Sequence, residues 1–511
     1  MPSSASPPAP AAERGVIARL QSASPRAIRR AEWVALGLLA AIAFALWLAY
    51  PVAPTFDSAW ALVWGHQILA GHVPDFAAYR APTEHPLWVI FGMLCAALGS
   101  AGPRAMTFVG VVSLLVVVIG LYRLSRVAFG TFAALISCVL LLSRFHFAFY
   151  GAFAYLDVPY IGLLVWAAVL EAERPRRGGS VWVLLILAGL LRPDAWLYTL
   201  CYAIWLGWHE SRAKQVRLLC MVAVPAILWA LLDFAVTGSA TFSFTFTTGH
   251  AEELARTEPI SAIPGSVLSG LLDLAKPPVL IAAVLGVGLA YRRMEHKRYA
   301  VQLALAIAGI ASFVITSAAG FSVVNRYLAL ASVALMCFAG YLLAELLILI
   351  LSRRHETPVL VAAAIALIIA GAGWEAFHLS PGGAASELTL RVKLESEVSS
   401  LLRSPAVVAA RRCGPISVPN HKLMPLLLID LGTPPIRDVV ARSDTSTARA
   451  RQYGAAFVMR GGSRVLYDSE YGPYANNSLD PKSINYPPKG FKLQLTDRYL
   501  AVYTRCPAAV G

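Results

Sequence analysis

Ionisable residues gather in one short segment that directly follows the first long apolar run of the sequence. The segment holds the acids Asp57, Asp75 and Glu84 and the basic or titratable residues Arg80 and His85. Carboxylates and imidazoles are the usual proton acceptors and donors in catalysis, and guanidinium groups bind anions. These residue types therefore favour a site that moves a proton and holds an anion.

Three further charged motifs lie at the ends of later apolar runs. They are Tyr155-Leu156-Asp157, Arg192-Pro193-Asp194 and Asn325-Arg326-Tyr327. A charge beside lipid is costly, so its presence there requires a structural or functional reason. The sequence contains no Walker-type phosphate loop, no Cys-x-x-Cys pair and no histidine pair at metal-ligand spacing. We therefore expect no soluble nucleotide chemistry and no required cofactor, and a divalent metal is not indicated.

The elements that must position these residues are membrane-spanning helices. Hydrophobic residues make up 58% of the chain, charged residues make up 14%, and the mean hydropathy is +0.63. A soluble domain carries roughly half apolar and about a quarter charged residues. Several apolar runs approach the roughly 20 residues that a helix needs to cross a bilayer, at 33–50, 216–236, 300–319 and 359–374. We expect a mainly α, polytopic helical bundle over residues 32–376.

The distribution of basic residues sets the expected orientation of this bundle. Short loops rich in Lys and Arg lie on the cytoplasmic side, and such clusters occur at 174–177, 212–217, 292–298 and 353–354. Residues 1–31, a basic tail that we expect to be disordered, precede the first span on that side. The loops 53–85 and 237–276 carry more acids than bases and are assigned outside. This alternation predicts about eleven crossings.

One stretch fits the alternation poorly. Residues 86–122 hold enough apolar sequence for two helices, whereas a basic turn at Arg123 and Arg126 requires an odd number of crossings there. A short re-entrant or interfacial segment resolves the parity. The formal net charge of +14 lies largely in the inside loops and the amino tail, so the topology explains it without a nucleic-acid partner.

The composition changes after the last apolar run. Residues 386–511 show polar alternation, turn motifs and short β-rich runs such as Ala456-Phe457-Val458-Met459, which favour a small extracytoplasmic α/β domain. Cys413 and Cys506 are the two cysteines of this domain, and thiols oxidise outside the cytoplasm. We predict a disulfide between them; the alternative is two unpaired thiols. Asn476-Asn477-Ser478 also matches a glycosylation sequon.

The order of the charged motifs along the membrane part resembles the GT-C superfamily of membrane glycosyltransferases. The landmarks are Phe56-Asp57-Ser58-Ala59-Trp60 after the first span, an amphipathic loop helix, and a Pro-containing return to the membrane at Tyr79 to Trp88. Later landmarks are Gly151 to Asp157, Leu190 to Trp196 and Asn325 to Leu328. Relatives include protein mannosyltransferases, lipid A aminoarabinose transferases and arabinofuranosyltransferases. Many of these relatives carry a second acid at the position of Ser58. Because this chain has only Asp57 there, the resemblance does not extend to a two-carboxylate or metal-dependent mechanism.

The resemblance implies a donor sugar linked through phosphate to a polyprenol in the bilayer and an acceptor that offers a hydroxyl. It makes Asp57 the expected general base of a transfer that inverts the sugar. Arg80, His85, Arg192 and Arg326 are then expected to bind the donor phosphate and to stabilise the leaving group. Expected contacts to the acceptor or the sugar come from Asp75, Glu84, Trp60 and Tyr79.

The expected setting is a multi-pass protein of a plasma membrane. A basic chain rich in Ala, Arg and Pro is typical of a high-GC bacterium, so the acceptor would be an envelope glycan or another hydroxyl-bearing lipid or protein. The carboxyl-terminal domain would lie above the first loop and guide that acceptor. The sequence does not name the sugar, the acceptor or the length of the lipid.

Each assignment has a structural alternative. Asp57 would serve as the N-cap of the loop helix and Asp157 as the cap of its own helix. Arg80 would extend to lipid headgroups, and Arg326 would anchor the topology. The remaining candidates have equally plain roles: solvated loop charges for Asp75 and Glu84, interfacial aromatics for Trp60 and Tyr79, and stabilisation of a broken helix for Arg192 and Asp194.

Two other functions compete with transfer. A secondary transporter carries ionisable groups beside broken helices at mid-membrane, and Arg192-Pro193-Asp194 is such a break. The second half of the chain has no matching break, however, and most of the polar residues lie at the outer ends of spans. A non-enzymatic envelope assembly protein is the other alternative, and it leaves the charges of the first loop unexplained.

Overall fold

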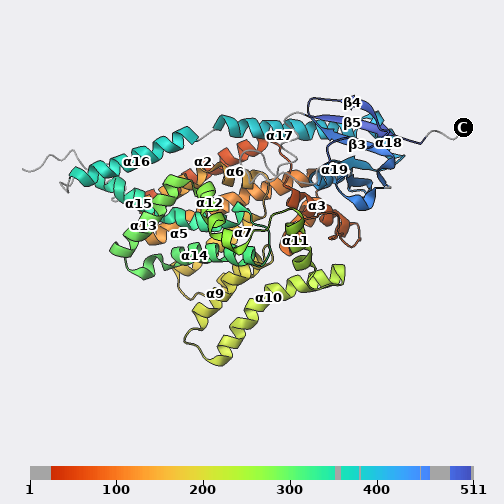
Figure 1. Ribbon diagram of the computed structural model, residues 1–511. Coiled ribbons are helices and arrows are strands. Elements are labelled where there is room, and N and C mark those ends of the chain that lie inside the picture. The colour runs from red at the N-terminus through yellow and green to blue at the C-terminus, as the bar shows by residue number, and fades with distance from the viewer. Residues whose placement is uncertain (1–24, 352–357, 379–380, 449, 461–483, 508–511) are drawn as a thin grey trace, which may run out of the picture.

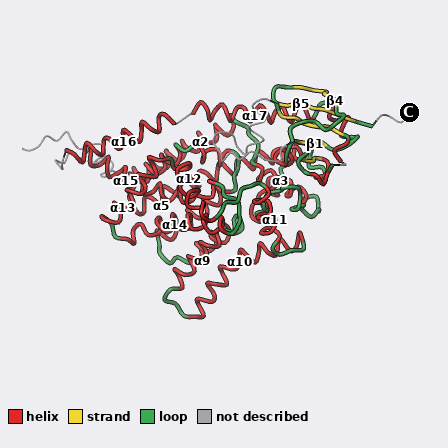
Figure 2. Tube along the Cα trace, in the orientation of Figure 1, coloured by secondary structure: helices red, strands yellow, loops and turns green. Residues whose placement is uncertain are grey.

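The protein is helical for most of its length and ends in a small sheet (Figures 1 and 2). This computed structural model describes residues 25–351, 358–378, 381–448, 450–460 and 484–507. The sequon at Asn476, the basic pair Arg353 and Arg354, and most of the expected amino-terminal tail lie outside the described residues. The helices of the membrane part are α2 (Pro25–Ala49), α3 (Phe56–Leu69), α4 (Pro86–Ala96), α5 (Gly102–Leu142), α6 (Phe145–Ala152), α7 (Asp157–Glu173), α8 (Gly179–Gly189), α9 (Ala195–Gly207), α10 (Arg212–Thr237), α11 (Phe242–Glu253), α12 (Ile263–Ala275), α13 (Pro277–Arg293), α14 (His296–Ala318), α15 (Ala329–Leu351) and α16 (Pro358–His378).

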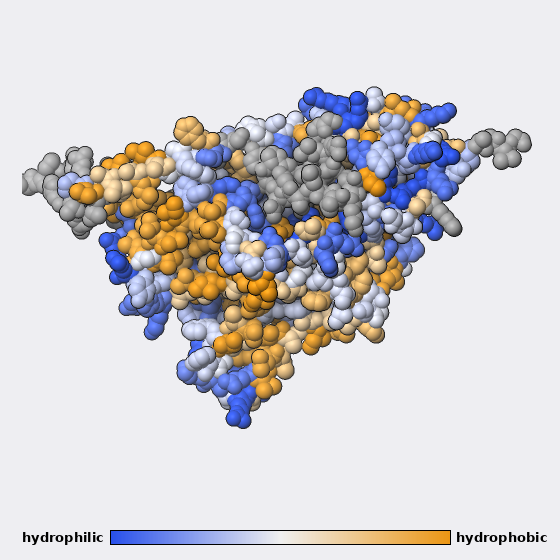
Figure 3. Space-filling model, in the orientation of Figure 1, coloured by the Kyte–Doolittle hydropathy of each residue, from blue (hydrophilic) through white to orange (hydrophobic). Residues whose placement is uncertain are grey.

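The apolar helices are long enough for a multi-pass membrane protein. Within the described part of the chain, six helices have the length and composition of a span, or up to eight if each of two bent pairs counts as one. The bent pairs are α6 with α7, at 111°, and α12 with α13, at 105°. Apolar residues cover much of the visible bundle surface, whereas polar residues cover the carboxyl-terminal end (Figure 3). The total of about eleven crossings stays a prediction.

The stretch after residue 85, where the charge pattern and the apolar length disagreed on the number of crossings, begins with a short helix. Helix α4 has 11 residues, and a helix of that length rises only about 16 Å, roughly half of the hydrocarbon thickness. Its length is therefore too short for a full crossing, which agrees with the expected short re-entrant or interfacial segment. The turn expected at Arg123 and Arg126 is wrong: both residues lie within α5, and the helix breaks instead at Gly130, where φ is 87°. Glycine adopts that positive φ without the steric cost that a side chain imposes.

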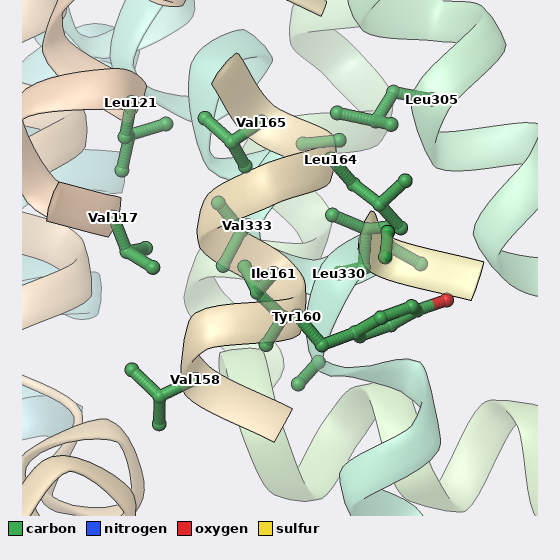
Figure 4. Packing of buried hydrophobic residues seen from close by; sticks show 14 of the residues in the cluster. Val117, Leu121, Val158, Tyr160, Ile161, Leu164, Val165, Leu305, Leu330 and Val333 are labelled. Carbon is green, nitrogen blue, oxygen red and sulfur yellow. The ribbon is translucent and has the colours of Figure 1, made fainter. Parts of the chain in front are cut away.

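Helix α7 lies at the centre of the bundle. Its residues Val158, Ile161 and Val165 pack against α5 on one side, while α14 and α15 lie on the other (Figure 4). Helix α15 also packs against α5, α13 and α14. Because Asp157 is the first residue of α7, this packing fixes the position of its carboxylate in the fold.

Helices α3 and α4 cross in direct backbone contact. A Cβ atom on Gly65 would overlap the backbone of Met93, and one on Gly92 would overlap the carbonyl group of Ala61. The absence of side chains at these two positions lets the helices approach this closely. Helix α3, which carries Asp57, is thereby held close against α4.

The carboxyl-terminal end contains a five-stranded mixed sheet in the order β2-β1-β3-β5-β4. Strands β2, β1 and β3 are parallel, while β3, β5 and β4 are antiparallel. The predicted run at Ala456 lies in β3, and the predicted disulfide joins Cys413 to Cys506. The elements are α17 (Pro381–Leu402), α18 (Pro405–Arg411), β1 (Ile416–Val418), α19 (Met424–Asp430), β2 (Val439–Ala441), β3 (Gly454–Met459), β4 (Lys492–Thr496) and β5 (Leu500–Arg505).

The sheet shares its hydrophobic core with the first loop of the membrane part. Trp60 and Trp64 of α3 pack in one cluster with Val398 of α17, Leu427 of α19 and Phe457 of β3. Contacts at the edge of this cluster include a hydrogen bond from the Tyr79 hydroxyl to Ser443 Oγ, at 3.3 Å. The carboxyl-terminal domain therefore rests on α3, which carries Asp57.

Candidate functional site

An open pocket with a cavity volume of about 180 Å³ lies where the first loop, the second loop and the carboxyl-terminal domain meet. An adjoining cavity of about 70 Å³ shares Asp57, His85, Arg326 and Tyr327 with it. Together they form the candidate site. The charged and titratable residues that line the larger pocket are Asp57, Arg80, His85, His250, Arg256, Arg326, Arg391, Glu395, His421 and Lys422.

Asp57 lies in the first turn of α3. The cap of that helix is Thr55, whose side chain accepts a hydrogen bond from the Ser58 amide, so the alternative that Asp57 is the N-cap is wrong. The unsatisfied amides at a helix start favour a negative charge in the first turn. Asp57 Oδ2 lies 3.4 Å from the Arg326 guanidinium, and the two side chains are 14% and 12% exposed. The pair is nearly enclosed but opens into the pocket.

Arg326 also connects Asp57 to a second acid. Its Nε lies 3.6 Å from Asp157 Oδ2, and the other Asp157 oxygen pairs with Arg192. Arg192 Nε in turn donates to Asp194 Oδ1 at 2.9 Å. Alternating acids and cations thus run from α3 through η3 (Asn325–Leu328) and α7 to the break between α8 and α9. Each buried charge faces an opposite one, which limits the cost of burying it.

Two tyrosines and a serine complete this network. The Arg192 guanidinium lies 4.0 Å from the centre of the Tyr327 ring, a distance at which a cation is attracted to the ring face. The Tyr160 hydroxyl donates to Asp194 Oδ2 at 2.8 Å, and Ser312 Oγ donates to the same oxygen at 3.2 Å. Asp194 is thus held by three donors. It stabilises the helix break and orients Arg192 toward the site at the same time.

Arg80 also lines the pocket and has a strained backbone conformation. Its φ is 50°, a region that residues with a side chain rarely adopt. The side chain is 1% exposed and lies 3.5 Å from Glu253 at the end of α11. Arg80 therefore ties the first loop to the second loop and does not extend to lipid headgroups.

His85 lies between the two cavities and is neutral at ordinary pH. Burial, followed by the nearby charge of Arg192, lowers the pKa of its imidazole to about 3. The ring packs edge-on against Trp229 of α10, with 5.8 Å between the ring centres. His85 can donate or accept one hydrogen bond in the pocket, but it adds no positive charge.

The four residues expected to bind the acceptor do not line either cavity. Trp60 is fully buried under the carboxyl-terminal domain, and Tyr79 reaches Ser443 of that domain. Asp75 is exposed in the segment between α3 and α4. Glu84 is fully buried and points to Ser243 of α11. The structure thus brings together Asp57, Arg80, His85, Arg192 and Arg326, and it leaves these four outside.

The pocket also contains cations that the sequence patterns did not single out. Arg256 comes from the second loop, Arg391 from α17 and Lys422 from the turn before α19. Arg256 stands among the acids Glu252, Glu253 and Glu258, so the local sequence reads as acidic. Arg391 and Lys422 belong to no recognisable motif, and only the docking of the carboxyl-terminal domain brings them over Asp57.

A separate apolar cavity of about 490 Å³ adjoins the polar site. It lies among α9, α10, α11 and α14, and its walls include Leu197, Ala226 and Ile315. Thr83 and Asp194, which also face the smaller polar cavity, lie at its border. Among the described residues, no three His, Cys, Asp or Glu side chains converge as a metal site would require.

No protein-family profile and no curated protein sequence matches this chain. Solved structures do. ArnT from Cupriavidus metallidurans bound to undecaprenyl phosphate aligns with a TM-score of 0.56 at 15% identity, over 94% of this chain and 99% of ArnT. The apo form of that ArnT gives 0.53 at 16% identity, over 93% and 98%. The Archaeoglobus fulgidus oligosaccharyltransferase with a tethered acceptor peptide gives 0.51 at 10% identity, over 85% of this chain and 69% of that one.

These similarities show the fold of the chain. ArnT, an aminoarabinose transferase, and the oligosaccharyltransferase are both GT-C glycosyltransferases. The resemblance expected from the order of the charged motifs is therefore confirmed at the level of the fold, as is the mainly α membrane bundle with a small sheet at its end. The activity has to be argued from the site itself.

Proposed function

We propose that this multi-pass membrane protein is a glycosyltransferase that moves a sugar from a polyprenyl-phosphate donor to an acceptor hydroxyl at the extracytoplasmic face. The observation that carries the proposal is the Asp57–Arg326 pair, at 3.4 Å, in a pocket whose charged lining residues are mostly cations. A base next to a fixed cation matches a reaction in which a proton is removed while an anion departs.

Asp57 acts as the general base of this reaction. It takes the proton of the acceptor hydroxyl as the hydroxyl oxygen attacks the anomeric carbon of the donor sugar. The bond between that carbon and the phosphate oxygen breaks, and its electron pair leaves with the lipid phosphate. Attack from the side opposite to the leaving group inverts the anomeric configuration in a single step.

Arg326 stabilises the departing phosphate, together with Arg80, which lines the same pocket. Arg192 holds Asp157 and Asp194 and thereby keeps the Arg326 side of the site in place. His85 contributes a neutral hydrogen bond. Because guanidinium groups already face the acids of the site, we expect transfer to proceed without a divalent metal. Transfer measured in excess EDTA checks this, and the rate should equal the rate without EDTA.

The two kinds of cavity suit the two parts of a polyprenyl phosphate. The phosphate and sugar need the cationic pocket, while the isoprenoid chain gains free energy by leaving water for an apolar surface. The apolar cavity among α9, α10, α11 and α14 borders the polar site at Thr83 and Asp194. A donor placed across this border has its phosphate near Arg326 and its chain toward the bilayer.

The carboxyl-terminal side of the pocket is the proposed acceptor side. Arg391, His421 and Lys422 line it from α17 and the start of α19. These residues replace Trp60, Asp75, Tyr79 and Glu84 as the expected acceptor contacts, since those four lie outside the cavities. We place this domain outside the plasma membrane of a bacterium, with an envelope glycan or another hydroxyl-bearing molecule as acceptor.

Turnover in a defined bilayer tests the proposal. The purified protein is reconstituted in proteoliposomes with a panel of polyprenyl-phosphate sugars, and the release of polyprenyl phosphate is followed with and without candidate acceptors. Acceptor-dependent release supports a transferase. Solute uptake by the same vesicles without any lipid-linked sugar, together with no release from any donor, contradicts it and supports a transporter.

A further inference from the structure

A buried polar cluster joins the first loop to α10 and α11 beside the site. It consists of Glu84, Trp229, Asp233 and Ser243, with exposed fractions of 0%, 4%, 2% and 9%. Ser243 Oγ lies 2.6 Å from Glu84 Oε1 and 2.7 Å from Asp233 Oδ1. Trp229 Nε1 donates to the same hydroxyl at 2.8 Å. None of these four side chains lines the cationic pocket.

The hydrogens of this cluster can be counted. A serine hydroxyl has one hydrogen to donate and two lone pairs that accept. Trp229 occupies one lone pair, and the single hydrogen satisfies only one of the two carboxyl groups. The second carboxyl lies at hydrogen-bond distance from an oxygen that has no hydrogen left to offer. That contact is favourable only if this carboxyl carries a proton and donates it.

We propose that Glu84 and Asp233 hold one proton between them, and that this shared proton is a positioning device which keeps the His85 side of the candidate site docked on α10 and α11. One proton completes every hydrogen bond to Ser243 Oγ. No proton leaves two buried carboxylates facing one hydroxyl, and such like charges repel strongly.

The surroundings favour the protonated state. The second Glu84 oxygen is buried and finds no hydrogen-bond partner among the described residues, which disfavours a charge there. Burial, followed by the hydrogen bond with Asp233, raises the pKa of Glu84 to about 8. Asp233 is the acid that faces Glu84 from α10, while α11 offers the uncharged Ser243. Arg192 and Asp194, between α8 and α9, act on the neighbouring His85.

Thr83 and His85, the neighbours of Glu84 in the sequence, connect the protonation of this cluster to the candidate site. Thr83 Oγ1 lies 2.6 Å from Thr247 Oγ1 of α11, and His85 packs on Trp229. Thr83, His85 and Thr247 all line both polar cavities. Repulsion between Glu84 and Asp233 would separate the first loop from α10, and with it from α11, and would displace these lining residues.

Infrared spectroscopy of the full-length protein in a bilayer tests the shared proton without any turnover. A protonated carboxyl has a carbonyl stretch distinct from that of a carboxylate. Glu84→Gln and Asp233→Asn are each expected to remove the same band from the spectrum at pH 6, because the amide supplies the hydrogen and leaves the remaining acid ionised. The matched control is Glu171→Gln, since the hydrogen bonds of Glu171 come from the hydroxyl of Tyr202, the indole of Trp205 and the backbone amides of Arg176 and Arg177, and not from a second acid.

The pH profile of transfer is the second measurement and rests on the proposed function. Wild-type transfer should decline as the pH rises through about 8, mainly through a higher KM for the donor, whereas Glu84→Gln should keep a flat profile there. A band unchanged by both substitutions overturns the shared proton. Loss of the band with an unchanged pH profile overturns the positioning role. Absence of transfer in the wild type and in every variant overturns the proposed function, but the infrared spectra still show whether Glu84 and Asp233 share a proton.

Discussion

Arg326 Nη2 lies 3.4 Å from Asp57 Oδ2, although 269 positions separate the two residues in the sequence. The contact joins the start of α3 to the short η3 turn that precedes α15. The proposed base and the proposed phosphate ligand thus come from opposite ends of the membrane part in the sequence, and substitutions of each residue separate their roles.

Replacing Asp57 by Asn removes the base and keeps the size of the side chain. General bases contribute about 10²–10⁴-fold to a rate, so kcat should fall by about that factor while the binding of polyprenyl phosphate persists. Donor turnover and lipid binding by the same preparation check this. Glu258→Gln, an exposed acid of the second loop, is the control. Transfer at the wild-type rate in Asp57→Asn would disprove the base assignment.

Replacing Arg326 by Lys keeps the charge but loses the planar fork that reaches Asp57 and Asp157 together. We expect weaker binding of polyprenyl phosphate and a lower kcat, because both the bound and the departing phosphate lose a fixed donor. Arg326→Ala should be more severe than Arg326→Lys. Equal binding of polyprenyl phosphate by wild type and both variants would exclude Arg326 as a phosphate ligand.

Arg192→Gln should affect stability as well as activity. Removing one partner from a buried ion pair leaves an uncompensated charge and costs about 3–5 kcal/mol. Here Asp194 loses its arginine, and Asp157 keeps only the longer contact to Arg326. Thermal unfolding in detergent should show a clearly lower Tm. The companion variant Arg293→Gln removes a pair whose arginine is 62% exposed, and it should leave the Tm nearly unchanged.

Gly92→Ala should separate α3 from α4. The added methyl group overlaps the Ala61 carbonyl, and overpacking of this kind costs about 1–3 kcal/mol. Since α3 carries Asp57, transfer should fall together with the Tm. Gly373→Ala is the matched control, because a methyl group there meets open space and alanine is favoured over glycine in a helix by about 0.8–1.0 kcal/mol. A Tm equal in both variants would show that the helices tolerate a wider spacing.

The raised pKa of Glu84 predicts a specific dependence of stability on pH. Its ordinary value is near 4.5 and its folded value is about 8, so between these limits the folded state binds more protons than the unfolded state. Stability therefore falls as the pH rises from about 4.5 to about 8 and levels off above. In Glu84→Gln this slope should be shallower. Parallel Tm curves for wild type and variant over that range would contradict the assignment.

Hydropathy and charge pattern were sufficient to predict the class of fold. Long apolar runs need internally bonded helices in lipid, so their presence fixes a helical bundle regardless of detail. The strand at Ala456 and the disulfide between Cys413 and Cys506 were also predicted correctly. The turn at Arg123 was placed wrongly because basic residues mark a membrane face, whereas the backbone breaks where a positive φ is tolerated, at Gly130.

The site was only partly predictable, for a physical reason. Asp57, Arg192 and Arg326 stand next to helix starts or breaks, where a charge beside an apolar run is conspicuous in the sequence. Glu84 stands in the same loop, yet its side chain turns away from the pocket because Ser243 and Asp233 surround it. Lys422 reaches the pocket only through tertiary docking, which no local pattern encodes.

The hydrophobic core shared by α3 and the carboxyl-terminal sheet has a consequence for biosynthesis. Trp60 and Trp64 are translated near the start of the chain, but their packing partners, from Leu394 to Val502, are translated near its end. Phe76 and Val89 can pack with these rings early, but the cluster is complete only when the ribosome has nearly finished. We therefore expect a chain that stops early to insert its spans without completing the surroundings of Asp57.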